Sequence, residues 1–152
     1  MALNPQKAIY SERVMKIATA LALLILTGTG WTQKIPLDGI AHVGYRVRDS
    51  EKTAAFYSGV LGLPRAFTAS DGAAFFKVND EQYLEFAPGL SAQDDIRLTH
   101  IAFATNDIQS LRRLLQSRGI TAPNVAKDSA GELSFSLRAP EGTRIDFVSR
   151  HR

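Results

Sequence analysis

A histidine followed seven residues later by an aspartate occurs twice in the chain, in the segments IAHVGYRVRDSEKTAAFYSGVLGL and LTHIAFATNDIQSLRRLLQSRGI. The first copy contains His42 and Asp49, and the second contains His100 and Asp107. In each copy the histidine lies in a short apolar strand pattern, and a helical pattern follows the aspartate. An internal repeat of this kind restricts the fold strongly, because it predicts two structural units of the same plan.

Both copies predict the same order of elements. In the first copy a strand over 39–47 leads to a helix that is capped at Asp49 or Ser50 and runs to Leu61. Turn residues then separate three further strands, over 65–69, 73–78 and 82–87. The second copy predicts a strand over 97–105, a helix capped at Asn106 or Asp107, and strands near 124–127, 133–138 and 144–148. The sequence therefore predicts an α+β fold of two βαβββ modules, over 39–90 and 96–150.

Two histidines and two carboxylates occupy matching places in the two modules. His42 and His100 lie in the first strand of each module, and the last strand of each module carries one carboxylate, Glu85 or Asp146. Alternation along a strand places every second side chain on one face, and small residues beside ionisable ones leave space for a pocket. The predicted pocket face holds His42, Gly44, Arg46, Tyr83, Glu85, His100, Arg144 and Asp146.

Imidazole and carboxylate groups on the inner face of a sheet must be paired, hydrated or bound to metal, because their burial is otherwise expensive. Together they suit zinc, iron, manganese, nickel or cobalt. The alternative is that both histidines are ordinary strand residues, hydrogen-bonded in a polar core. Their equivalent positions in a repeat, beside equivalent carboxylate strands, favour a metal site with an open position for substrate.

Four motifs together resemble the vicinal oxygen chelate superfamily: IAHVGYRVRDSEKTAAFYSGVLGL, EQYLEFAPG, LTHIAFATNDIQSL and APEGTRIDFV. This superfamily includes glyoxalase I, bleomycin-resistance and fosfomycin-resistance proteins, methylmalonyl-CoA epimerase and extradiol dioxygenases. The resemblance covers residues from about 40 to 149. It implies an open, eight-stranded mixed barrel built from paired βαβββ modules, with a divalent metal in its mouth.

The resemblance assigns the metal ligands residue by residue. It implies that His42 and Glu85 from the first module, with His100 and Asp146 from the second, hold one divalent ion such as zinc, iron, nickel or manganese. Asp146 departs from the usual pattern, which has glutamate at the last ligand position. Either the strand carrying Asp146 lies closer to the metal, or Asp146 lies outside the ligands and the site has two histidines and one carboxylate.

The leading functional hypothesis is a metal-dependent lyase, isomerase or dioxygenase that chelates vicinal oxygens of a small substrate and stabilises an enolate-like intermediate. In a lyase or isomerase, Glu85 or Asp146 would take the proton of the substrate as the catalytic base. Arg46 would anchor an anionic substrate, unless it is a surface residue at the end of its strand, and Tyr83 and Arg144 are further substrate-binding candidates. The alternative is a metal-free binding protein similar to bleomycin-resistance proteins.

Composition excludes several other classes. The net charge of +3 is small and scattered, so we expect no nucleic-acid partner. The absence of cysteine excludes disulfides and thiolate metal ligands. We expect a small-molecule substrate as the main partner. Relatives in the superfamily often form dimers, so a homodimer is a further expectation.

The N-terminal 30 residues resemble a secretory signal peptide. From Met15 they contain one lysine, an apolar run over 17–26 and then small residues. The run is shorter than the roughly 20 apolar residues that cross a bilayer. We expect a start at Met15, a linker over 31–38, a domain over 39–150, and a periplasmic or secreted protein that contacts a membrane only through the signal segment. The alternative is an amphipathic helix on a cytoplasmic protein.

Overall fold

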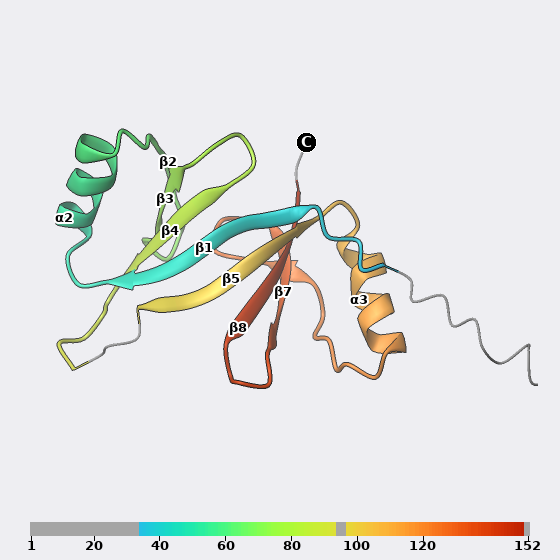
Figure 1. Cartoon of the computed structure of the whole chain (residues 1–152). Helices are drawn as coiled ribbons and strands as arrows, with labels where there is room; N and C mark the ends of the chain where they lie inside the picture. The colour runs from blue at the N-terminus through green and yellow to red at the C-terminus, as the bar shows by residue number, and fades with distance from the viewer. Residues whose placement is uncertain (1–33, 94–96, 151–152) are drawn as a thin grey trace, which may run out of the picture. The chain divides into compact units, whose positions relative to one another are not determined.

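Two βαβββ modules form one eight-stranded mixed sheet in the computed structural model, which describes residues 34–93 and 97–150 (Figure 1). The first module contains β1 (Gly39–Val47), α2 (Ser50–Ala54), which continues as the π-helix η1 (Ala55–Val60), β2 (Arg65–Thr68), β3 (Ala74–Lys77) and β4 (Tyr83–Pro88). The second contains β5 (Leu98–Thr105), α3 (Ile108–Ser117), β6 (Ala126–Lys127), β7 (Leu133–Arg138) and β8 (Arg144–Ser149). The predicted α+β fold is confirmed.

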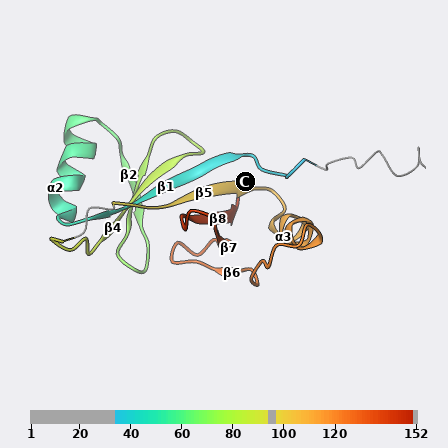
Figure 2. The same cartoon turned by 60° about the horizontal axis from the view of Figure 1, so that its bottom comes forward.

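The modules join edge to edge through their first strands. β1 and β5 run antiparallel, and each pairs in parallel with the last strand of its own module, β4 or β8. The strand order is therefore β2-β3-β4-β1-β5-β8-β7-β6, and the sheet curls into an open half-barrel (Figure 2). The β2–β3 turn reaches the β6–β7 turn, where the backbone N–H and the hydroxyl of Ser70 both donate to the carbonyl of Ser129, at 3.0 and 3.1 Å.

Helix α3 covers the outer face of the second module. Asp107 caps it by accepting a hydrogen bond from the N–H of Ser110, as the sequence predicted. The apolar stripe of the helix packs on two phenylalanines of β7 and β8. The buried residues of this core are Ile108, Leu111, Leu115, Ala122, Phe135 and Phe147.

The helix of the first module packs less deeply. Asp49 caps it through the N–H of Lys52, but from Ala55 onward it widens into a π-helix. Ala54 and Tyr57 pack against Phe76 and Phe86. The helical pattern of the sequence predicts that Phe56, Val60 and Leu61 lie on the apolar side of this helix, but all three are exposed. The change from α-helical to π-helical turns at Ala55 breaks the 3.6-residue spacing on which that prediction depends.

The N-terminal segment lies outside the described residues. This includes the signal-peptide prediction and the proposed start at Met15. Among the described residues, no helix is long and apolar enough to cross a membrane.

Candidate metal centre

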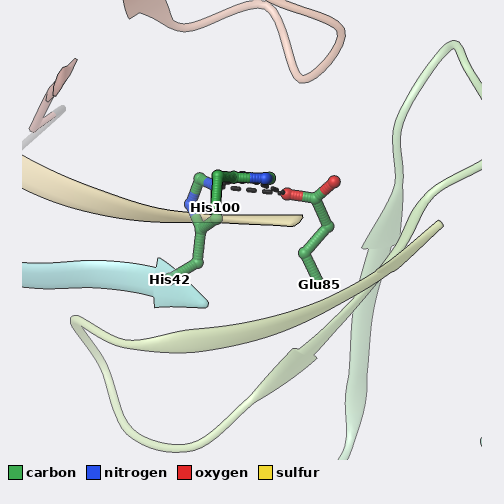
Figure 3. Close-up of side chains that lie close together, drawn as sticks. All are labelled: His42, Glu85 and His100. Carbon is green, nitrogen blue, oxygen red and sulfur yellow. Dashed lines mark hydrogen bonds and ion pairs between the residues drawn. The ribbon is translucent and has the colours of Figure 1, made fainter. Parts of the chain in front are cut away.

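Three side chains from three adjacent strands converge on one point of the inner face (Figure 3). Nε2 of His42 lies 3.0 Å from Nε2 of His100, and Oε2 of Glu85 lies 3.1 Å from the first and 3.2 Å from the second. All three side chains are buried to nearly nine-tenths or more. The structure thus brings together three of the four ligands expected from the sequence.

Strand register places the three residues there. Gly44 of β1 lies opposite Glu85 on β4 and opposite His100 on β5, and His42 lies two residues earlier on the same face of β1. Long side chains from β4 and β5 can therefore meet the His42 ring above Gly44. β4 and β5 both pair with β1, so the spacing is fixed by backbone hydrogen bonds rather than by loops.

The spacing of the three atoms fits a divalent ion. Three ligands about 2.1 Å from one ion, at angles of about 90–110°, have donor atoms about 3.0–3.4 Å apart. The observed distances of 3.0, 3.1 and 3.2 Å fall in that range. Two imidazoles and one carboxylate on one side of an ion leave its other positions open. His42, Glu85 and His100 would therefore hold the metal, and its remaining positions would face the substrate.

Glu85 is held in its charged form. Burial by itself raises the pKa of this carboxyl group, but hydrogen bonds and charge from His100 and His42 outweigh burial and lower the pKa to about 2. Nδ1 of His100 contacts the hydroxyl of Thr99 at 2.9 Å. In the tautomer whose Nδ1 proton is donated to that hydroxyl, the Nε2 atom of His100 would be available as a ligand to a metal ion.

Asp146 is buried beside the cluster but has a different partner. Both of its oxygens accept hydrogen bonds of 2.7 Å from Arg144, two residues earlier on β8. Its Oδ2 lies 3.7 Å from Nε2 of His100 and is not one of the three converging atoms. The geometry matches a site of two histidines and one carboxylate, with Asp146 at its margin.

A glycine gives the His100 ring its place. A Cβ atom added at Gly44 would lie 2.2 Å from Cε1 of His100, 2.5 Å from Nδ1 and 2.8 Å from Nε2, all too close for real atoms. The φ angle of Gly44 is not in the left-handed region. Gly44 is therefore required for space rather than for backbone conformation. The sequence showed only that a small residue lies beside His42.

A pocket of about 430 Å³ lies beside His42, between the two modules. His42 is the only member of the converging triad in its lining, and Tyr83 is the only predicted substrate-binding residue there. Arg144 is engaged with Asp146, and Arg46 is exposed on β1 outside the pocket lining. Phe67 and Phe75 form a stacked aromatic wall of this pocket, which sequence reasoning missed because phenylalanines in strands are ordinary core residues.

A family model supplies the classification. Residues 39–147 match the model of the Glyoxalase/Bleomycin resistance protein/Dioxygenase superfamily. The chain belongs to this superfamily. A search of curated protein sequences finds no match.

Solved structures of the superfamily share the fold. Methylmalonyl-CoA epimerase from Mycobacterium tuberculosis is 17% identical, with a TM-score of 0.65 over 81% of this chain and 95% of that chain. A variant of methylmalonyl-CoA epimerase from Streptomyces coelicolor, in complex with 2-nitronate-propionyl-CoA, is 21% identical. Its TM-score is 0.65, over 76% of this chain and 99% of that chain. At these identities the similarity supports the fold alone.

In this member of the glyoxalase superfamily, His42, Glu85 and His100 lie on the inner face of the sheet where β1 and β5 join the two modules. The chemistry available there follows from its residues. The triad can hold a Lewis acid, and Asp146 places a second carboxylate at its margin. The pocket beside His42 can hold the body of a small molecule.

Proposed function

We propose that the chain is a divalent-metal-dependent enzyme of the isomerase or lyase type. It would remove a proton from the carbon adjacent to a carbonyl group of its substrate. The observation that carries this proposal is the convergence of His42 Nε2, Glu85 Oε2 and His100 Nε2 within 3.0–3.2 Å of one another, beside a pocket. Methylmalonyl-CoA epimerases share the fold, and the proposal takes the isomerase class from them as its starting hypothesis.

His42, Glu85 and His100 would hold the ion, and a bound divalent ion would act as a Lewis acid on the substrate oxygens. Asp146 is the remaining carboxylate at the site, and we assign it the role of proton acceptor. Arg144 fixes its orientation through two hydrogen bonds of 2.7 Å, which leave each oxygen with a further acceptor position. Glu85 would be occupied as a ligand of the ion, so its carboxylate is the less available proton acceptor.

Iron in the same site would indicate oxygen chemistry, because two histidines and one carboxylate also form the ligand set of non-haem iron oxygenases. A metal-free binding protein is the second candidate. It is favoured by the pocket itself, since the pocket lining includes one member of the triad only.

The cellular setting is part of the proposal. The pattern in residues 15–30 supports export to the periplasm or secretion, and sequencing the N-terminus of the protein from a native-like host would test it. Retention of residues 1–30 in the mature protein would contradict export. Light scattering would show whether two copies form a homodimer.

Proton exchange in D₂O tests the proposed reaction. We would incubate the full chain with 2-hydroxyacetophenone, which has vicinal oxygens and an exchangeable C–H, and follow loss of that proton by NMR. Zinc-, nickel- and manganese-loaded protein should accelerate exchange, and metal-free protein should not. Asp146→Asn should reduce the exchange rate on the order of 10²-fold without removing the metal. Equal exchange by metal-free and loaded protein would contradict the proposal, and oxygen uptake by the iron form would indicate a dioxygenase.

A further inference from the structure

The pocket beside His42 has an aromatic wall on the side of the first module. Phe67 stacks on Phe75, with ring centroids 4.5 Å apart and an angle of 13° between the planes. Tyr83 continues the wall, with its ring 6.2 Å from that of Phe67. All three side chains line the pocket.

Phe67 is incompletely covered in this wall. Its side chain lies on β2, an edge strand, and the residue is 41% exposed although it is stacked on Phe75, which is 4% exposed. One face of the Phe67 ring is thus covered by Phe75, while the rest of its surface remains exposed beside the pocket. A second flat ring is the natural partner for such a surface, because offset stacking adds to the gain from apolar burial.

The aromatic wall is continuous with the triad. The ring of Phe75 meets the ring of His42 edge to face, with centroids 5.3 Å apart and an angle of 83°. His42 in turn contacts Glu85 and His100. A molecule whose oxygens lie at the triad can therefore extend directly along the wall.

The floor of the pocket is made of small apolar side chains. Ala41 and Ala104 contribute from β1 and β5, Val148 from β8, and Ala130 from the turn between β6 and β7. These residues leave a volume of about 430 Å³, at the lower end of the usual range for ligand pockets. A single ring with short substituents suits this volume better than a large cofactor ester.

The charges around the pocket disfavour an anionic ligand. Among the described residues of its lining, Arg150 is the only lysine or arginine, and its Nη1 lies 3.1 Å from Oε1 of Glu81. Four carboxylate residues line the same pocket: Asp80, Glu81, Asp128 and Glu132. Asp80 is itself paired with Lys77, whose Nζ lies 2.7 Å from its Oδ1, and the one guanidinium of the lining is paired with Glu81. An anionic group entering here would therefore find no lysine or arginine of the described lining left to bind it.

We propose that the substrate carries an uncharged aromatic ring, which enters this pocket and stacks on Phe67 while the vicinal oxygens of the substrate lie at the triad. This inference rests on the proposed function, because the triad must hold a metal to bind those oxygens. It names a substrate class different from the 2-nitronate-propionyl-CoA bound in the similar epimerase structure.

Two hydroxamates that chelate through the same two oxygens test the inference. Benzohydroxamate carries a phenyl ring, and acetohydroxamate carries a methyl group in its place. Their dissociation constants for the zinc-loaded full chain would be measured by calorimetry. We expect benzohydroxamate to bind about 10-fold tighter or more, from stacking and apolar burial of the ring.

Variants locate the preference. Phe67→Ala should reduce the ratio of the two constants to less than about 3-fold, and Phe67→Leu, which keeps apolar area without a flat face, should give an intermediate ratio. Phe56→Ala is the matched control, because Phe56 is an exposed phenylalanine that does not line the pocket. Its ratio should equal that of the parent chain, and zinc affinity should be unchanged in all three variants.

Charge is tested with para-substituted probes. A 4-carboxybenzohydroxamate should bind several-fold more weakly than 4-methylbenzohydroxamate, which has similar size and no added charge. Equal binding of benzohydroxamate and acetohydroxamate would contradict the inference that the pocket binds an aromatic ring. It would not contradict the proposed metal site. Failure of both to bind would overturn the proposed function and this inference with it. Tighter binding of the carboxylate probe would overturn the preference for an uncharged ring.

Discussion

The two modules share one plan but contribute unequally to the site. The first supplies His42 and Glu85, whose side chains meet at 3.1 Å. The second supplies His100 to the same point, while its carboxylate, Asp146, is bound by Arg144 on both oxygens. Equivalent strands therefore deliver similar residue types, but Glu85 meets two histidines whereas Asp146 is bound by a neighbouring arginine.

The same contrast holds for the helices. Helix α3 buries Ile108, Leu111 and Leu115, and α2 with η1 buries no residue completely. The second module, whose helix is the more deeply buried, supplies only one residue of the triad, His100. The comparison suggests that the second module stabilises the fold while the first supplies most of the site.

The largest expected effect is on stability. Leu111 is fully buried, so Leu111→Ala should reduce the free energy of unfolding by about 2–5 kcal/mol. Leu61→Ala, at an exposed position at the end of η1, should change it by about 0.5 kcal/mol or less. Urea unfolding would measure both, and equal losses would remove the proposed difference between the helices.

The next effect separates the two carboxylates. Glu85→Ala should weaken zinc binding on the order of 10²-fold or more, because it removes a ligand, whereas Asp146→Ala should weaken it by about 10-fold or less. Competition with a chromophoric chelator would give both affinities. Similar losses for the two variants would show that Asp146 is also a direct ligand.

The acid dependence of the metal-free chain tests the Glu85 cluster. The pKa of Glu85 is lowered from 4.5 to about 2 in the folded chain. The contribution of Glu85 to the stability of the fold is therefore complete above pH 4.5 and is lost as the pH falls toward 2. We expect a loss of about 2 kcal/mol over this interval. Unfolding of Glu85→Gln should lack this component, and an identical pH profile for both proteins would contradict it.

The smallest expected effect concerns the residue under the His100 ring. Gly44→Ala should displace that ring and weaken zinc binding by about 10-fold, a change comparable to the loss of a supporting contact. The matched change in the second module, Ala102→Gly, should leave zinc binding near its parent value. In the parent chain, Gly44→Ala should also lower the free energy of unfolding, because the added Cβ meets the His100 ring. In a His100→Ala background, Gly44→Ala should leave the free energy of unfolding unchanged. A persistent cost there would indicate a backbone role for Gly44.

Much of the fold followed from local patterns. The repeat located both modules, and Asp49 and Asp107 marked the helix starts that the structure shows. Strand alternation placed His42, Glu85 and His100 on one face, where they meet. These features depend on period and capping, which a sequence displays directly.

Other features depend on contacts that the sequence does not display. The π-helix leaves Phe56 and Leu61 exposed although their spacing suggested burial. Arg144 and Asp146 were visible as neighbours on one face, but their ion pair depends on side-chain geometry. The aromatic wall of Phe67 and Phe75 arises from pairing of β2 with β3 and from its position beside the second module.

The most direct test of the central claim is the zinc stoichiometry of the full chain after equilibration with zinc and removal of excess, measured by mass spectrometry. The His42→Ala/His100→Ala double variant, shown by circular dichroism to be folded, is the control. One equivalent in the parent and none in the variant is the predicted result. No uptake by the parent, or equal uptake by the folded variant, would contradict a metal centre formed by His42, Glu85 and His100.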